Sequence, residues 1–210
     1  MSSQNRNEEK TFWLRLGLSV LLIAPMWLVK AYEWYAKVEL SRLGIFPGNT
    51  SGLKGIFFAP FIHGNLEHLL YNSAALLFLL TVLLNSYPFA AGAVIVFSQL
   101  FSGLIVWLFA AEDAYHIGSS GIIYGIAAFL ISSGFLRKDR YAFSVAILIL
   151  LTYGGIAAGF FPKEGISWQS HIAGAIAGMI MALIFRNVNV IANTEDEDEL
   201  PKEHFFDESN

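Results

Sequence analysis

The chain has 210 residues, of which 55% are hydrophobic and only 14% are charged. Typical soluble domains have roughly 25% charged residues, so this composition, with a mean hydropathy of +0.54, indicates an integral membrane protein. The net charge of −4 reflects acids near the C-terminus. The sequence has no basic patch of the kind that nucleic acid requires, and the absence of cysteine excludes disulfides, thiol catalysis and Cys-based metal sites.

The chain begins with a polar segment at residues 1–11, followed by an apolar run at 12–29 whose only charge is Arg15. The run has some features of a signal peptide, but no convincing small-residue cleavage site follows it and further apolar segments do. We therefore predict a cytoplasmic N-terminal segment at 1–11 and a first transmembrane helix at 12–29.

A long connection at residues 30–62 follows the first helix. Glycine and proline interrupt it, yet it carries apolar residues such as Phe57, Phe58 and Phe61. We expect a long structured loop that packs on the helices or enters the membrane interface, because so apolar a segment is poorly suited to water.

Five more transmembrane helices are predicted after this loop. The stretch 69–111 contains no charged residue and is too long for one span of about 20 residues. The segment Asn85-Ser86-Tyr87-Pro88 divides it into two. The predicted helices are 66–84, 89–110, 118–136, 141–161 and 166–185. The expected fold class is an all-α integral membrane protein, with a six-helix membrane domain at 12–186. Residues 187–210, which hold eight of the 17 acids, are predicted to be a disordered cytoplasmic tail.

The orientation follows from the short loop Arg137-Lys138-Asp139-Arg140, whose basic residues predict a cytoplasmic location. Six spans then place both termini in the cytoplasm. The basic residues of the first loop oppose this assignment, but charge counting has less weight in a long, apolar loop.

Polar residues gather near the starts of three predicted helices that all begin on the outer side. These residues are His63, His68, Asn72, Ser120 and His171. Ionisable residues inside membrane spans are costly and face the interior of a bundle, so they are candidates for function.

His68 and Asn72 are four residues apart and share one helical face, where two donors aimed at one point would suit a developing oxyanion. His63 taken alone is more simply a structural residue that binds loop carbonyls.

Ser120 lies in Gly118-Ser119-Ser120-Gly121, which has the character of a nucleophile turn, although a serine there is more often a helix cap. Ser119 is the competing nucleophile.

His171 shares a helical stripe with Gly174 and Gly178, while Gly121 and Gly125 form a similar stripe on helix 118–136. Packing of these stripes would bring His171 to Ser120 as a general base. No acid completes a Ser-His-Asp triad inside the spans, because Glu67, Glu112, Asp113 and Glu164 lie in loops or at helix ends. A Ser-His dyad is therefore the simpler interpretation. Tyr124 either supports the imidazole or is an ordinary aromatic residue of the core.

These motifs resemble those of the rhomboid family of intramembrane serine proteases. His63-Gly64-Asn65-Leu66-Glu67-His68-Leu69-Leu70-Tyr71-Asn72 is similar to its His-x4-His-x3-Asn pattern. Gly118-Ser119-Ser120-Gly121 is similar to its Gly-x-Ser-Gly pattern, and His171-Ile172-Ala173-Gly174 with Gly178 to its His-x-x-Gly-x-x-x-Gly pattern. The resemblance covers roughly residues 12–186. Lys54-Gly55 stands where the family often has Trp-Arg.

The resemblance implies a serine endopeptidase of a bacterial inner membrane that cleaves single-span membrane protein substrates in the lipid bilayer without a cofactor or metal. It implies that Ser120 is the nucleophile and His171 the general base, with an acyl-enzyme intermediate. The oxyanion site would be His68, Asn72 and the backbone N–H of Ser120. Tyr124 resembles the aromatic partner of the histidine. The other supporting residues are His63, Gly118, Gly121, Gly174 and Gly178.

The resemblance also makes helix 141–161 and its loop a candidate gate, in which Gly154, Gly155 and Gly159 would soften the helix. Two other function classes stay open. A transporter or metal-handling protein would use imidazole ligands from His63, His68, His116 and His171, although no Asp, Glu or Cys accompanies them at ligand spacing. An inactive rhomboid-like protein would only bind membrane helices.

Overall fold

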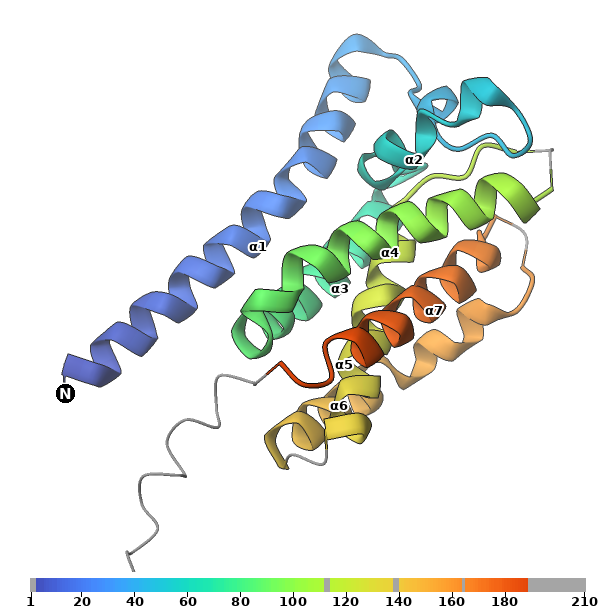
Figure 1. The fold of residues 1–210 in the computed structure, drawn as a ribbon. Coiled ribbons are helices and arrows are strands. Elements are labelled where there is room, and N and C mark those ends of the chain that lie inside the picture. The colour runs from blue at the N-terminus through green and yellow to red at the C-terminus, as the bar shows by residue number, and fades with distance from the viewer. Residues whose placement is uncertain (1–2, 112–113, 138–139, 164, 189–210) are drawn as a thin grey trace, which may run out of the picture.

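The computed structural model describes residues 3–111, 114–137, 140–163 and 165–188. Within these residues the regular secondary structure is helical (Figure 1). The only β pairing among them is an isolated antiparallel bridge between Ile45 and His116. The predicted acidic tail lies outside the described residues, except for Asn187 and Val188.

Four helices are long and apolar enough to cross a membrane: α1 (Ser3–Ala36), α3 (Leu66–Ser86), α4 (Pro88–Phe109) and α5 (Ser120–Arg137). Two others are shorter but also apolar, namely α6 (Arg140–Tyr153) and α7 (Trp168–Ile184). The chain is therefore a multi-pass membrane protein, whereas the count of six spans stays a prediction.

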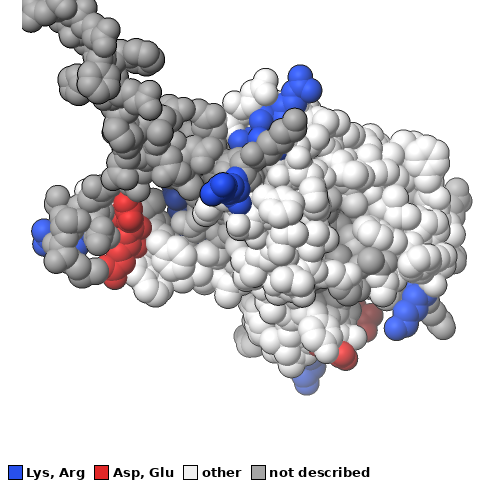
Figure 2. Space-filling view, turned by 90° about the horizontal axis from the view of Figure 1, so that it is seen from below, with Lys and Arg blue, Asp and Glu red and all other residues white. Residues whose placement is uncertain are grey.

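The broad apolar surface of the molecule agrees with a membrane location. In Figure 2 most of the described surface is white, and charged side chains appear at only a few places on it. Large apolar side chains such as Leu14, Leu151 and Phe89 are strongly exposed. Lipid rather than water would cover them at the lowest free-energy cost.

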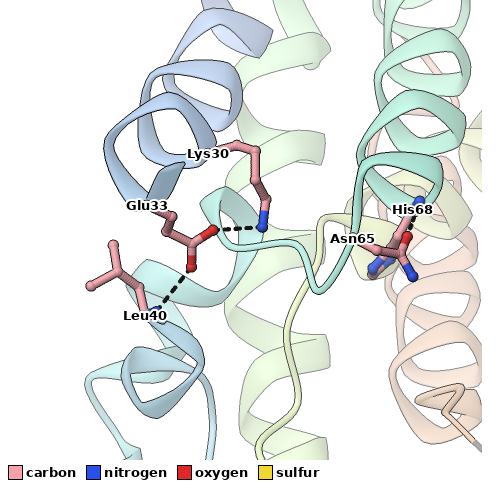
Figure 3. A network of polar contacts seen from close by, with 5 residues as sticks. All are labelled: Lys30, Glu33, Leu40, Asn65 and His68. Carbon is pink, nitrogen blue, oxygen red and sulfur yellow. Dashed lines mark hydrogen bonds and ion pairs between the residues drawn. The ribbon is translucent and has the colours of Figure 1, made fainter. Parts of the chain in front are cut away.

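The helix starts follow from local chemistry. Asn65 caps α3, and its side-chain oxygen accepts the N–H of His68 at 2.7 Å (Figure 3). Pro88 opens α4, a position where the missing N–H costs nothing, and so confirms the predicted break at 85–88.

The helix boundary predicted at residue 29 is wrong, because α1 continues to Ala36. Lys30 and Glu33 are one turn apart, both buried, and form an ion pair of 2.6 Å (Figure 3). Glu33 also accepts the N–H of Leu40 at 2.9 Å. The ion pair neutralises both charges within the helix, which ends where Lys37 takes a φ of 52°.

The segment after α1 contains η1 (Ser41–Leu43), η2 (Thr50–Gly52), α2 (Gly55–Phe58) and η3 (Ala59–Phe61). Side chains of α4 hold it in place: Gln99 Nε2 donates to the Ile56 carbonyl at 2.6 Å, and Trp107 Nε1 donates to the Asn49 carbonyl at 2.8 Å. A Cβ at Gly55 would overlap the backbone of Gly44. This close contact is a physical reason for glycine at the position where the sequence departs from the Trp-Arg pattern.

Helix α5 packs more extensively against α7 than against any other element. A Cβ at Gly174 would overlap the carbonyl oxygen of Gly121, and a Cβ at Gly178 would overlap that of Gly125. The predicted packing of helix 166–185 on helix 118–136 is therefore confirmed, with backbone lying directly on backbone.

We expect Gly174→Ala to lower the thermal unfolding midpoint of the detergent-purified protein, because overpacking of a close contact costs about 1–3 kcal/mol. Gly92→Ala is a matched control, since Gly92 is exposed on α4 and its Cβ would have no neighbour within 4 Å. Equal midpoints for the two variants would contradict the packing argument.

Candidate active site

One cavity of about 900 Å³ lies where the first turns of α3, α5 and α7 meet. Its lining includes His68, Asn72, Ser120, Tyr124 and His171. The structure therefore brings together the polar residues that the sequence distributes over three helices.

The two candidate serines differ in their surroundings. Ser120 is half-buried and lines this cavity. Ser119 is only 1% exposed and instead lines a separate apolar cavity beside α1 and α4. Only Ser120 is placed to meet a ligand in the cavity that holds His171.

The turn before Ser120 is fixed against α3 by Gly118, which has a φ of 104°. A Cβ at Gly118 would lie 2.7 Å from Cε1 of His68 and 3.4 Å from Nδ2 of Asn72, so both the φ and the space require glycine. Its N–H donates to the carbonyl of Ala59 at 2.8 Å. The segment between α1 and α3 thus holds the Ser120 turn beside the two predicted oxyanion donors.

Two ring contacts and one hydrogen bond orient His171. Its Nδ1 lies 2.8 Å from the carbonyl oxygen of Gly159. A carbonyl only accepts hydrogen bonds, so Nδ1 carries the proton of the neutral ring and Nε2 keeps its lone pair. The imidazole stacks on Tyr124 with ring centroids 4.1 Å apart and an interplanar angle of 7°. Phe160 in turn packs edge-on against Tyr124, with centroids 5.1 Å apart.

Gly159 contributes the carbonyl that orients His171. From the sequence it was identified only as a glycine that makes its helix more flexible. It lies in η4 (Gly154–Phe160), which follows α6 and replaces the end of the helix predicted at 141–161. A Cβ at Gly159 would overlap the hydroxyl of Tyr124 and lie 2.9 Å from Nδ1 of His171. The glycine itself was the available signal, but a backbone acceptor has no sequence signature because every residue has a carbonyl.

Asn72 is buried and bonded to His63, whose Nε2 accepts from Asn72 Nδ2 at 3.0 Å. An amide nitrogen has two hydrogens, so this bond fixes the amide plane while using one of them. The rings of His63 and His68 pack edge to face with centroids 4.9 Å apart. His63 therefore supports both predicted oxyanion residues, a contact that the sequence did not reveal.

His116 connects the strand-like segment before Ser120 to the helix of His171. Its backbone pairs with Ile45, and its Nδ1 lies 2.7 Å from the hydroxyl of Ser167, the N-cap of α7. The metal hypothesis assigned His116 a ligand role, but within the described residues no group of three or more His, Cys, Asp or Glu could hold a metal ion.

The family model of the rhomboid domain matches residues 50–188. The chain belongs to the rhomboid family. It is 34% identical over 185 residues to an uncharacterised protein from Mycobacterium tuberculosis, covering 82% of this chain and 76% of that relative. It is 35% identical over 154 residues to a putative rhomboid protein from Acanthamoeba polyphaga mimivirus, covering 70% and 84%. Rhomboid-family proteins are known as intramembrane proteases, and the matched region includes every residue of the candidate site.

We expect acid to destabilise this rhomboid-family protein partly through His63. Burial lowers the pKa of His63 to about 3, and the neighbouring His68 adds to the effect. His63 takes up a proton near pH 6.5 in the unfolded chain, whereas in the folded protein it stays neutral down to about pH 3. The free energy of unfolding is therefore unaffected by His63 above pH 6.5 and falls as the pH is lowered from 6.5 toward 3. At pH 5 the free energy of unfolding is lower by about 2 kcal/mol than at neutral pH on account of His63.

Thermal unfolding at pH 7.5 and pH 5 would measure this effect. His63→Gln retains an acceptor for Asn72 but does not titrate, so its midpoint should fall less between the two pH values. An identical fall in the variant would contradict the assignment.

Proposed function

We propose that this protein is an intramembrane serine endopeptidase in which Ser120 and His171 form a catalytic dyad. The observation that best supports it is the bond from His171 Nδ1–H to the Gly159 carbonyl. That bond leaves Nε2 as the basic nitrogen of an imidazole on the same cavity as Ser120. Membership of a family of intramembrane proteases supports the reaction class.

In the proposed first step Ser120 Oγ attacks the scissile carbonyl and its proton passes to His171 Nε2. The resulting imidazolium keeps its Nδ1–H bonded to Gly159, while the Tyr124 ring limits rotation of the imidazole. A backbone carbonyl then has the orienting role that a carboxylate has in a Ser-His-Asp triad. No charged residue has to be buried for this purpose.

The negative charge of the tetrahedral intermediate would be stabilised by His68, Asn72 and the backbone N–H of Ser120. Ser120 is the first residue of α5, where backbone N–H groups lack partners within the helix and the positive end of the helix dipole favours an anion. The bond to His63 holds Asn72 before the charge develops, which reduces reorganisation in the transition state.

Breakdown of this intermediate would return the proton from His171 to the leaving amine and leave an acyl-enzyme on Ser120. Hydrolysis requires water. A neighbouring cavity of about 760 Å³ also has Asn65, His68 and Ser167 in its lining and extends to Lys163 and Gln169. This polar neighbourhood is the proposed route of water to the acyl-enzyme.

The proposed substrates are single-span membrane proteins cleaved within the lipid bilayer near the outer end of their helix. The proposed arrangement has six spans within residues 12–186, both termini in the cytoplasm and residues 187–210 as a cytoplasmic tail. The basic sequence at 137–140 supports the orientation, and the mycobacterial relatives agree with a bacterial inner membrane.

We expect Ser120→Ala and His171→Ala each to lower cleavage of a labelled single-span substrate by at least about a thousandfold. Ser120→Ala should also abolish labelling by a fluorophosphonate, since only an activated serine reacts. Ser119→Ala is the matched control and should keep both activities. Activity in Ser120→Ala would refute the nucleophile assignment, and unlabelled wild-type protein would favour an inactive binder of membrane helices.

Asn72→Ala should lower the cleavage rate constant by about a hundredfold to a thousandfold, the usual effect of losing one oxyanion donor. Fluorophosphonate labelling should continue at a reduced rate, because Ser120 and His171 remain. Steady-state cleavage with the substrate concentration varied separates kcat from KM. A change confined to KM would show that Asn72 only binds substrate.

A further inference from the structure

Another cavity, lined by both polar and apolar side chains, lies at the other end of α3, between the first half of α1 and the start of α6. It has a volume of about 800 Å³, and Thr81, Val82, Asn85 and Ser86 of α3 line it. From Asn72 to Asn85 the helix rises by about 20 Å, so this cavity is distant from Ser120. The two cavities have no lining residue in common.

Arg15 contributes a guanidinium group from α1 to this cavity. Its Nη1 lies 3.5 Å from both the backbone and the side-chain oxygen of Asn85, at the upper limit for a hydrogen bond. Glu8 also lines the cavity, yet Arg15 forms no ion pair with any acid in the parts of the chain that the structure describes. A membrane helix therefore presents a cation whose contacts are two weak bonds to neutral oxygens, which is costly without an anion.

Residues with hydroxyl groups line the same cavity as Arg15. Those of Thr11 and Ser144 donate to the carbonyls of Asn7 and Arg140 in their own helices, and they can rotate toward a ligand. The remaining lining is largely apolar and includes Phe12, Val145 and Leu148. The cavity thus has a cationic, hydroxyl-bearing part and an apolar part, as an amphipathic ligand requires.

We propose that this cavity binds the phosphodiester headgroup of an anionic membrane lipid, with Arg15 as its main contact. A guanidinium binds phosphate through two parallel hydrogen bonds. Phe12 is 42% exposed and Leu148 is 47% exposed, so acyl chains reach the cavity along α1 and α6. Arg6 and Lys10 are also exposed on α1, and cations at a membrane surface favour anionic over zwitterionic lipids.

The bound headgroup would join α1 to α6 across the cavity. Helix α1 packs mainly on α3, and α6 packs mainly on α5. A ligand contacting both Arg15 and Ser144 would add a connection between these two flanking helices. The lipid would thus act as a structural ligand at the end of the bundle opposite the candidate active site.

The proposal can be tested by native mass spectrometry of the full chain in detergent. The probes are phosphatidylglycerol, phosphatidylcholine with the same acyl chains, and inorganic phosphate. We expect phosphatidylglycerol to bind more tightly than phosphatidylcholine. Arg15→Gln should weaken binding of phosphatidylglycerol by about tenfold, which corresponds to the loss of a charge-assisted contact.

Arg6→Gln is the matched control, because it removes the same charge from an exposed site on the same helix that does not line the cavity. It should change the affinity by less than about twofold. Ser144→Leu fills the cavity without altering charge and should also weaken binding, which keeps the test decisive if Arg15→Gln does not fold.

Equal losses in Arg15→Gln and Arg6→Gln would overturn the proposal. So would equal affinities for phosphatidylglycerol and phosphatidylcholine, or unchanged binding in Ser144→Leu. Displacement of the lipid by inorganic phosphate at a similar concentration would show a general anion site and would overturn the lipid assignment.

Discussion

The direct contact between the backbones of α5 and α7 is the constraint on which the rest of the site depends. Gly174 lies on the carbonyl of Gly121, and Gly178 lies on that of Gly125. Ser120 is the first residue of α5, and His171 lies one turn into α7, so this contact sets how near the two side chains can come. Larger side chains between the two helices would push them apart and separate the residues that line the cavity.

Polar groups near this contact are supported by partners from other parts of the chain. Asn72 is bonded to His63, His171 to Gly159 and the His116 ring to Ser167. A buried polar group without a partner costs roughly 2–7 kcal/mol in an apolar environment, so these bonds lower the cost of keeping a polar site within a membrane protein. The same bonds fix each side chain before any substrate arrives, which is what electrostatic catalysis requires.

The end of α6 shows how a change in helix type affects chemistry. The α-helix ends at Tyr153 and continues as a 3₁₀ helix to Phe160. A 3₁₀ segment has a different rise and turn from an α-helix, so it redirects the following carbonyls. One of them, the carbonyl of Gly159, accepts the hydrogen bond from Nδ1–H of His171. The proposed dyad therefore needs no acidic third member, and the backbone itself orients the base.

The sequence by itself determined the membrane class, the break before Pro88 and the residues that gather on the main cavity. These features follow from local patterns, namely long apolar runs, helix-capping residues and glycine stripes with helical spacing. Only the tertiary structure revealed the Gly159 carbonyl behind His171, the His63–Asn72 bond and the extension of α1 through Lys30 and Glu33. A backbone carbonyl is common to every residue, and the partners of a buried amide or an ion pair depend on which segments the fold brings together. Local sequence patterns do not encode those distances.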